Sequence, residues 1–276
     1  MVEAKDFWNV PDSVVMLLYL LTMISIAVLF LGFWSKTRIW ASGRDTDNSL
    51  KGLGPVGLLR ISLTKLFSSD CLLARRVFPR SIPRAILLVG IIWGFILLFL
   101  GTVSRTIDHY IYHFLYGNVW LTFSFVLDVA GLLLMLGTVF GLLRRYVWKP
   151  ERIATSIRDG LFLFWLFFVI FSGYVIEGTR IIVLNSPAAD WSPVGYAFGI
   201  AAHWASGGSI EGLKSIHLAF WIAHMFLSLS FIAYIPFSKG FHIFASQITT
   251  SLAAQKKEER TEAFTGLSRG RLAYCW

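Results

Sequence analysis

Five long apolar stretches constrain what this chain can fold into more than any other feature of its sequence. A membrane-spanning helix needs ~20 mostly apolar residues, and each stretch approaches that length when its flanking aromatic residues are included. The fourth stretch is the shortest and is continued by Ile176. The predicted spans are Val14–Trp34, Ala85–Thr106, Val119–Leu143, Leu161–Val175 and Leu213–Pro236 with a continuation. The sequence therefore predicts an all-α membrane protein, a bundle of five transmembrane helices.

The composition excludes an ordinary soluble domain. Hydrophobic residues make up 56% of the chain and charged residues only 15%, and its mean hydropathy is +0.65. The amino-terminal residues are acidic as much as basic, so we do not interpret them as a signal peptide, and the first apolar run is long enough to span and remain. The run Val194–Ala202 is short and glycine-rich, and we expect an interfacial loop there.

The distribution of lysine and arginine predicts how the helices are oriented. The segments 35–84, 144–158 and the part after Pro236 carry 21 of these residues, and the opposite side carries 4: Lys5, Arg105, Arg180 and Lys214. Positive charge collects on the cytoplasmic side of membrane proteins. We therefore expect the amino terminus outside and the carboxyl terminus in the cytoplasm, in the cell's inner (cytoplasmic) membrane. The net charge of +9 is accounted for by topology and lipid headgroups, and no nucleic-acid partner is expected.

We expect a transmembrane domain over residues 1–252, with a cytoplasmic loop at 35–84, and a polar cytoplasmic tail at 253–276. Within the loop, Val56–Phe78 mixes apolar and basic residues at helical spacing. This segment is either an amphipathic helix that docks a cytoplasmic partner or a plain loop on headgroups. Cys275 is either structurally idle or the remnant of an iron–sulfur segment.

Three histidines lie in register along the fifth stretch. His217 and His224 are seven residues apart and share a helix face, and His242 follows eighteen residues after His224. The second spacing corresponds to roughly 27 Å along a helix axis, close to the thickness of a bilayer core. Polar groups at membrane depth are costly and usually functional. The pattern favours a helix that ligates two stacked haems over a set of interfacial histidines.

Specific strings support a family resemblance. The chain resembles the membrane cytochrome b family that includes the gamma subunit of respiratory nitrate reductase, and most of all the branch of heterodisulfide reductase and dissimilatory sulfite reduction complexes. The strings occur in order between Gly90 and Ala245. They are IIWGFILLFLGT, TIDHY, LDVAGLLL, RRYVWKPER, EGTRI, WSPVGY and IPFSKGFHIF.

The resemblance implies five helices, one or two b-type haems, and electron exchange between a membrane quinone, such as menaquinone, and a cytoplasmic iron–sulfur subunit. It assigns His109 as a haem ligand on the second helix, with either His224 or His217 opposite it. His242 is the ligand expected on the cytoplasmic side. The second helix carries Leu88 where the partner of His242 is usual. That side therefore holds a haem with one protein ligand, a haem with an unexpected second ligand, or no haem.

Other polar residues near the predicted spans suit this chemistry. Haem propionates need cations, which Arg105 and Arg180 offer on one side and Arg84 and Lys239 on the other. A mid-span carboxylate such as Asp128 is costly unless paired, and we expect it to orient a ligand histidine or to relay protons. Glu177 is either the proton acceptor for quinol oxidation or an exposed acid in a loop. His113 is expected beside a haem edge or a quinone.

Two other classes of protein compete with this interpretation. A haem-poor scaffold that docks a soluble enzyme is compatible with Leu88. A transporter is disfavoured, because no inverted repeat and no paired breaks in corresponding helices are visible. Further complex subunits are expected as partners, besides lipid, quinone and the iron–sulfur subunit.

The asymmetry of charge predicts that Cys71 and Cys275 both lie in the cytoplasm. A membrane-impermeant maleimide should label neither thiol in intact cells and both after lysis. Labelling of either cysteine without lysis would reverse the predicted orientation.

Overall fold

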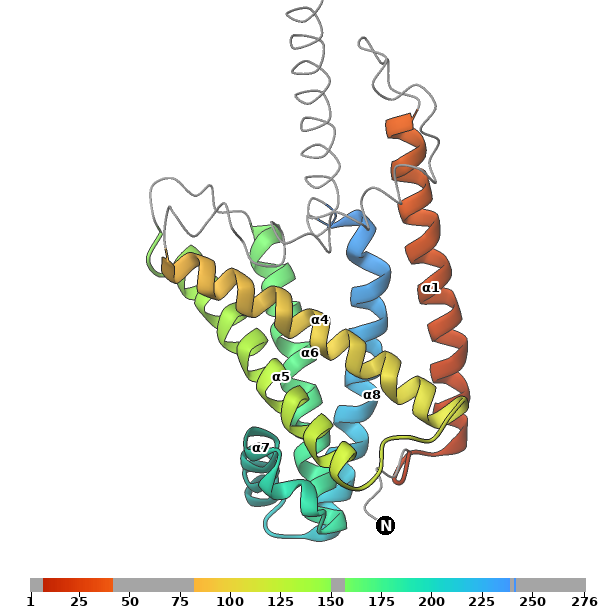
Figure 1. Cartoon of the computed structure of the whole chain (residues 1–276), viewed down its shortest axis with the longest axis vertical. Coiled ribbons are helices and arrows are strands. Elements are labelled where there is room, and N and C mark those ends of the chain that lie inside the picture. The colour runs from red at the N-terminus through yellow and green to blue at the C-terminus, as the bar shows by residue number, and fades with distance from the viewer. Residues whose placement is uncertain (1–6, 42–81, 150–156, 239–240, 242–276) are drawn as a thin grey trace, which may run out of the picture. The chain divides into compact units, whose positions relative to one another are not determined.

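The structure is a computed structural model that describes residues 7–41, 82–149, 157–238 and 241, without the side chains of 40, 41, 82–87, 158 and 159. Every regular element in these ranges is helical (Figure 1). Five helices are long and apolar enough to cross a membrane. They are α1 (Asp12–Ala41), α4 (Ile82–Tyr110), α5 (Gly117–Tyr146), α6 (Ile157–Leu184) and α8 (Ile210–Tyr234). The prediction of an all-α chain with five such helices is confirmed.

One prediction about an individual element is wrong. The run Val194–Ala202 is not a loop but most of a helix, α7 (Pro193–Ala205), which begins after the short 3-10 helix η1 (Pro187–Asp190). The fifth span runs through Pro236 as predicted, over Ile210–Phe237, but its helix α8 ends at Tyr234 and the 3-10 helix η2 (Ile235–Phe237) completes it. Proline lacks the amide that the next helical turn needs. The predicted loop, amphipathic helix and tail lie outside the described residues.

The chain divides into two compact units. The first holds residues 1–26 and 73–233, and the second holds 27–72 and 234–276. In the second unit, Gly32 of α1 lies against Pro236, since a Cβ on this glycine would come within 2.7 Å of the proline ring. The rings of Phe33 and Phe241 meet edge to face at 5.5 Å. All predicted site residues that the structure describes belong to the first unit.

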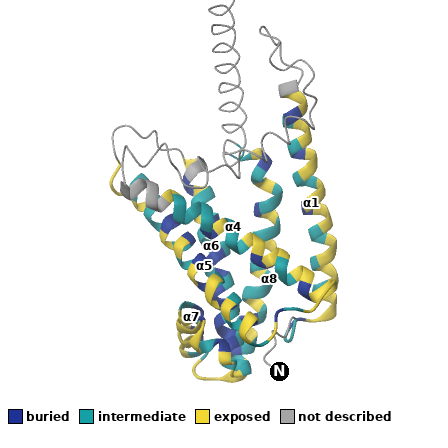
Figure 2. Ribbon diagram, in the orientation of Figure 1, coloured by how far each residue is buried: buried dark blue, intermediate teal, exposed yellow. Residues whose placement is uncertain are grey.

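Within the first unit, close backbone approach is concentrated in three helix pairs: α4 with α5, α5 with α6, and α6 with α7. Figure 1 shows α4 and α5 side by side. Burial follows the same pairs: Figure 2 shows buried residues gathered on α5 and α6. Exposed apolar side chains dominate α1, as expected of a helix that faces lipid.

Glycines set the close approach of α6 and α7. A Cβ at Gly178 would overlap backbone atoms of Gly195 and Gly199, and a Cβ at Gly199 would overlap the carbonyl of Gly178. Small residues four apart on a helix let two membrane helices approach this closely. The glycine content that suggested a loop in the sequence therefore serves helix packing.

Alanine at Gly178 or Gly199 should lower the free energy of unfolding by about 1–3 kcal/mol, the usual cost of overpacking. Thermal unfolding of the purified protein in detergent measures the effect. Gly90→Ala is the matched control, because no described atom lies within 4 Å of a Cβ there. Alanine is the better helix former, so this variant should be at least as stable as the parent. Equal behaviour of Gly90→Ala and Gly199→Ala would contradict the packing role.

Candidate functional site

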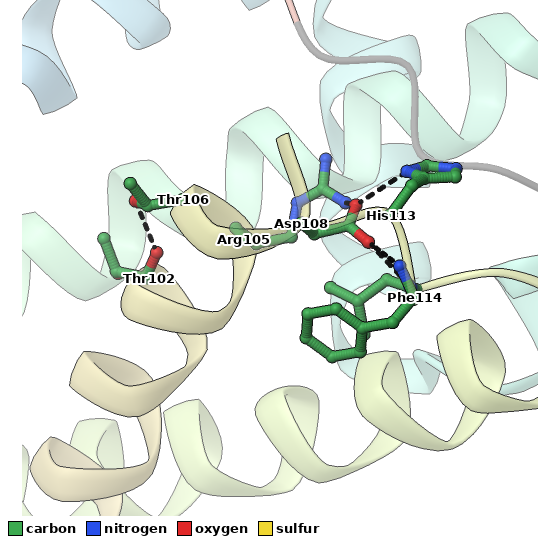
Figure 3. A network of polar contacts seen from close by, with 7 residues as sticks. Thr102, Arg105, Thr106, Asp108, His113 and Phe114 are labelled. Atoms are coloured by element: carbon green, nitrogen blue, oxygen red, sulfur yellow. Dashed lines mark hydrogen bonds and ion pairs between the residues drawn. The ribbon is translucent and has the colours of Figure 1, made fainter. Parts of the chain in front are cut away.

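The turn between α4 and α5 is organised by the carboxylate of Asp108 (Figure 3). Its Oδ1 accepts hydrogen bonds from the backbone amides of Phe114 and Leu115 at 2.7 and 2.6 Å. Its Oδ2 lies 3.4 Å from a guanidinium nitrogen of Arg105 and 3.4 Å from Nδ1 of His113. The carboxylate is buried and ties the last turn of α4 to the chain that enters α5. The structure thus places the ring of His113, four residues after His109, beside the carboxylate of Asp108.

Two predicted cation positions meet at one aromatic ring. The guanidinium carbons of Arg105 and Arg180 lie 5.1 and 5.2 Å from the centroid of the buried Trp120 ring. Arg105 comes from α4, Trp120 from α5 and Arg180 from α6. A cation close to an indole face is stabilised by the ring quadrupole. The arrangement collects two positive charges near one end of three helices, and each is also paired with a carboxylate, Arg105 with Asp108 and Arg180 with Glu177.

The carboxylate of Asp128 anchors the start of α7. Its Oδ2 accepts from the amide of Val194 at 3.0 Å and its Oδ1 from the amide of Gly195 at 2.8 Å. The first amides of a helix lack partners within the helix, and an anion there is also favoured by the helix dipole. Asp128 is only 1% exposed. No histidine is among its hydrogen-bond partners in the described residues.

Two further contacts tie α6 to the same point. The hydroxyl of Tyr174 donates to the backbone carbonyl of Asp128 at 2.5 Å. The hydroxyl of the fully buried Ser192 donates to Oε1 of Glu177 at 3.3 Å, and Arg180 reaches the same oxygen at 3.8 Å. The Glu177 carboxylate therefore accepts a hydrogen bond from a hydroxyl and forms an ion pair with a guanidinium.

The imidazole of His224 is fixed by α6. Its Nδ1 lies 3.0 Å from the backbone oxygen of Val169 and 2.9 Å from Oγ of Ser172. A carbonyl oxygen only accepts, so the Nδ1 atom must carry the proton. The lone pair is then on Nε2, which makes no hydrogen bond to any described residue. An imidazole whose Nδ1–H donates to a backbone carbonyl has the tautomer and orientation typical of a metal ligand.

His109 and His217 both contact the short segment that precedes α1. The ring of Phe7 lies 5.8 Å from the ring of His109 in an edge-on arrangement. The ring of Trp8 lies 4.8 Å from the ring of His217. The amide nitrogen of Asn9 lies 3.5 Å from Nδ1 of His217. His109 is exposed and His217 is 2% exposed.

The structure brings together only some of the predicted residues. Arg105, Arg180, Glu177 and His113 fall into one polar region through Trp120 and Asp108. His242 and Lys239 lie outside the described residues, as does the side chain of Arg84. Within the described ranges, no group of three or more histidine, cysteine and acidic side chains is placed to hold a metal ion.

Sequence reasoning missed the segment Phe7–Asn9, together with Ser192 and Tyr174. Phe7 and Trp8 are two aromatic residues shortly before Pro11 and the helix start at Asp12. Aromatic residues are enriched where membrane helices meet the interface, and that signal alone marks the segment. The hydroxyl partners could not be found, because they depend on which helices α7 contacts.

Asp128→Asn should lower the free energy of unfolding by about 1–3 kcal/mol, because it leaves a buried amide of α7 unpaired. The asparagine retains one acceptor oxygen and turns an NH2 group toward the second backbone N–H. Thermal unfolding in detergent measures the loss. The control is Asp190→Asn, the same change at an exposed position in η1. A stable Asp128→Asn protein that loses only activity would show a chemical role and contradict the anchoring role.

Comparisons with known proteins find two relatives. The chain is 29% identical over 253 residues to the "EtfAB:quinone oxidoreductase" of Syntrophomonas wolfei, covering 87% of this chain and 33% of that protein. It is 28% identical over 130 residues to the "Probable iron-sulfur-binding oxidoreductase FadF" of Bacillus subtilis, covering 47% of this chain and 18% of that protein. The chain thus spans a third or less of the length of these relatives. No protein-family model matches it, and no solved structure matches it.

The relatives support the coarser part of the predicted resemblance. Both are named as oxidoreductases, one with a quinone and one with an iron–sulfur group. Neither name mentions a cytochrome b, a haem or a nitrate reductase. The chain is thus similar to part of an electron-transfer oxidoreductase. It also has five helices long enough to span a membrane.

Proposed function

We propose that this chain is the haem b-bearing, quinone-reactive membrane part of an oxidoreductase. It transfers electrons between a membrane quinone and an iron–sulfur partner in the cytoplasm. The fixed tautomer of His224 carries the proposal, since Nδ1–H is held by Val169 and Nε2 is left for a ligand. The printed names of the two relatives, with quinone in one and iron–sulfur in the other, support the choice of redox partners.

The residues of this chain fit a haem in two ways. His224 on α8, through its Nε2, and His109 on α4 are the residues that would hold the haem iron. Arg105 and Arg180, gathered at Trp120, are the cations for the propionates. When bound, the haem supplies one-electron transfer between the two-electron quinone and the iron–sulfur partner.

The protein's own groups handle binding and protons. Asp128 holds α7 and thereby positions Ser192 on Glu177. Glu177 accepts a proton released by a quinol, and Arg180 stabilises the carboxylate in its ionised form. By the positive-inside rule, these residues lie toward the outer side of the membrane, opposite the basic cytoplasmic loops on which the iron–sulfur partner docks.

His224→Ala and His109→Ala should each remove the haem, because each takes away one of the two imidazoles that would hold it. A pyridine haemochrome assay with protein quantitation gives the haem per chain, and a reduced-minus-oxidised spectrum gives the ligation. His203→Ala, on α7 and away from the proposed ligands, should keep the full haem content. Parent protein without haem would refute the proposal, and full haem in His224→Ala would refute the choice of that residue.

A further inference from the structure

The residues Phe7, Trp8 and Asn9, which we call the amino-terminal strap, reach both α4 and α8. The ring of Phe7 lies 5.8 Å from His109 on α4 and 5.9 Å from Trp221 on α8. Its φ is 53°, a left-handed conformation that is an outlier for a bulky side chain. Such backbone strain collects at functional sites. The strap is thus held in an unfavourable conformation against two helices that carry histidines.

Asn9 presents its side-chain NH2 group to His217. Its amide nitrogen donates to the backbone oxygen of Lys214 at 2.8 Å, which establishes that the NH2 group faces α8. The same nitrogen lies 3.5 Å from Nδ1 of His217. A donor in that position favours Nδ1 as the acceptor and leaves the proton on Nε2. His217 therefore presents an N–H group, whereas His224 presents a lone pair.

Trp8 provides a second N–H group at the same place. Its ring lies 4.8 Å from the His217 ring, with 46° between the planes. Its Nε1 is buried and has no acceptor among the described residues. Buried polar groups are nearly always hydrogen-bonded, so this indole N–H calls for an acceptor that the described residues do not supply. The N–H of Trp8 thus lies beside the His217 ring, and the neighbouring Phe7 contacts Trp221, one helical turn after His217 on α8.

We propose that the strap and His217 bind the head group of a quinone, whose oxygen accepts hydrogen bonds from Trp8 Nε1–H and His217 Nε2–H. The inference deepens the proposed function and rests on it for the identity of the redox partner. A quinone ring is flat, apolar and neutral, with oxygens that only accept, which matches aromatic neighbours and neutral donors. A ligand with a carboxylate would instead be expected beside Trp120, where the guanidinium groups of Arg105 and Arg180 lie. The ammonium of Lys214 is engaged with Glu211 at 2.7 Å.

The test is equilibrium binding of two quinones, decylubiquinone and menadione, to the purified full chain in detergent. Trp8→Phe keeps an aromatic ring against His217 and removes only the N–H. The variant should bind the preferred quinone about five- to tenfold more weakly, the loss expected for one hydrogen bond, with unchanged haem content and spectrum. Trp204→Phe is the matched control at a side chain that is 82% exposed, and it should bind as the parent does.

His217→Gln and His217→Ala complete the test. Glutamine keeps a side-chain N–H donor and should retain much of the affinity, whereas alanine should lose it, both with full haem. Equal quinone affinity of Trp8→Phe and the parent would overturn the proposal, leaving a water as the partner of the indole. Loss of haem from His217→Ala would also overturn it, since His217 would then be a ligand. Binding that depends on Trp8 in a protein without haem would uphold the quinone site and refute the proposed haem.

Discussion

The carboxylate of Asp128 is the interaction on which the rest of the first unit depends. A charged side chain at this depth is tolerated only when it is fully paired, and both of its oxygens accept backbone amides of α7. The pairing fixes where α7 starts, and the glycines of α6 and α7 then allow their backbones to touch. Glu177 and Ser192 meet because α7 begins there. One buried charge thus accounts for the position of a whole helix and of a second acidic group.

Two histidines on one helix face differ in what they offer. His217 and His224 are seven residues apart, so they lie on the same face of α8, about two turns from each other. Their partners are not equivalent: His224 donates to a carbonyl of α6, while His217 faces an amide nitrogen from the strap. Hydrogen bonds to one ring nitrogen decide what the other can do. The same side chain can therefore serve as a metal ligand at one position and as a hydrogen-bond donor at the other.

Features that depend on neighbouring residues could be predicted from the sequence, and features that depend on contacts with distant residues could not. Hydropathy and length are local properties, so five spans were found, although α6 extends well beyond the predicted Leu161–Val175. The helix α7 was missed because its glycines favour a loop unless a distant carboxylate and another helix stabilise it. His217 and His224 were recognised by type and spacing and His109 through the family resemblance, but the tautomers of His217 and His224 depend on Asn9, Val169 and Ser172. The predictions for His242, Lys239 and Arg84 concern side chains outside the described part of the chain.

The way α8 is held agrees with the functions proposed for it. The closest backbone pairs are α4–α5, α5–α6 and α6–α7, and α8 is not among these pairs in the described residues. Side chains reach α8 instead: Trp165 donates to the carbonyl of Leu227, Ser25 to that of Leu229, and Asn9 to that of Lys214. Helices in direct contact lie only ~8–10 Å apart, too close for a planar group between them. In the described residues α8 is thus joined to its neighbours through hydrogen bonds to its carbonyls, and it makes no close backbone pair of the kind that would exclude the proposed haem or quinone ring.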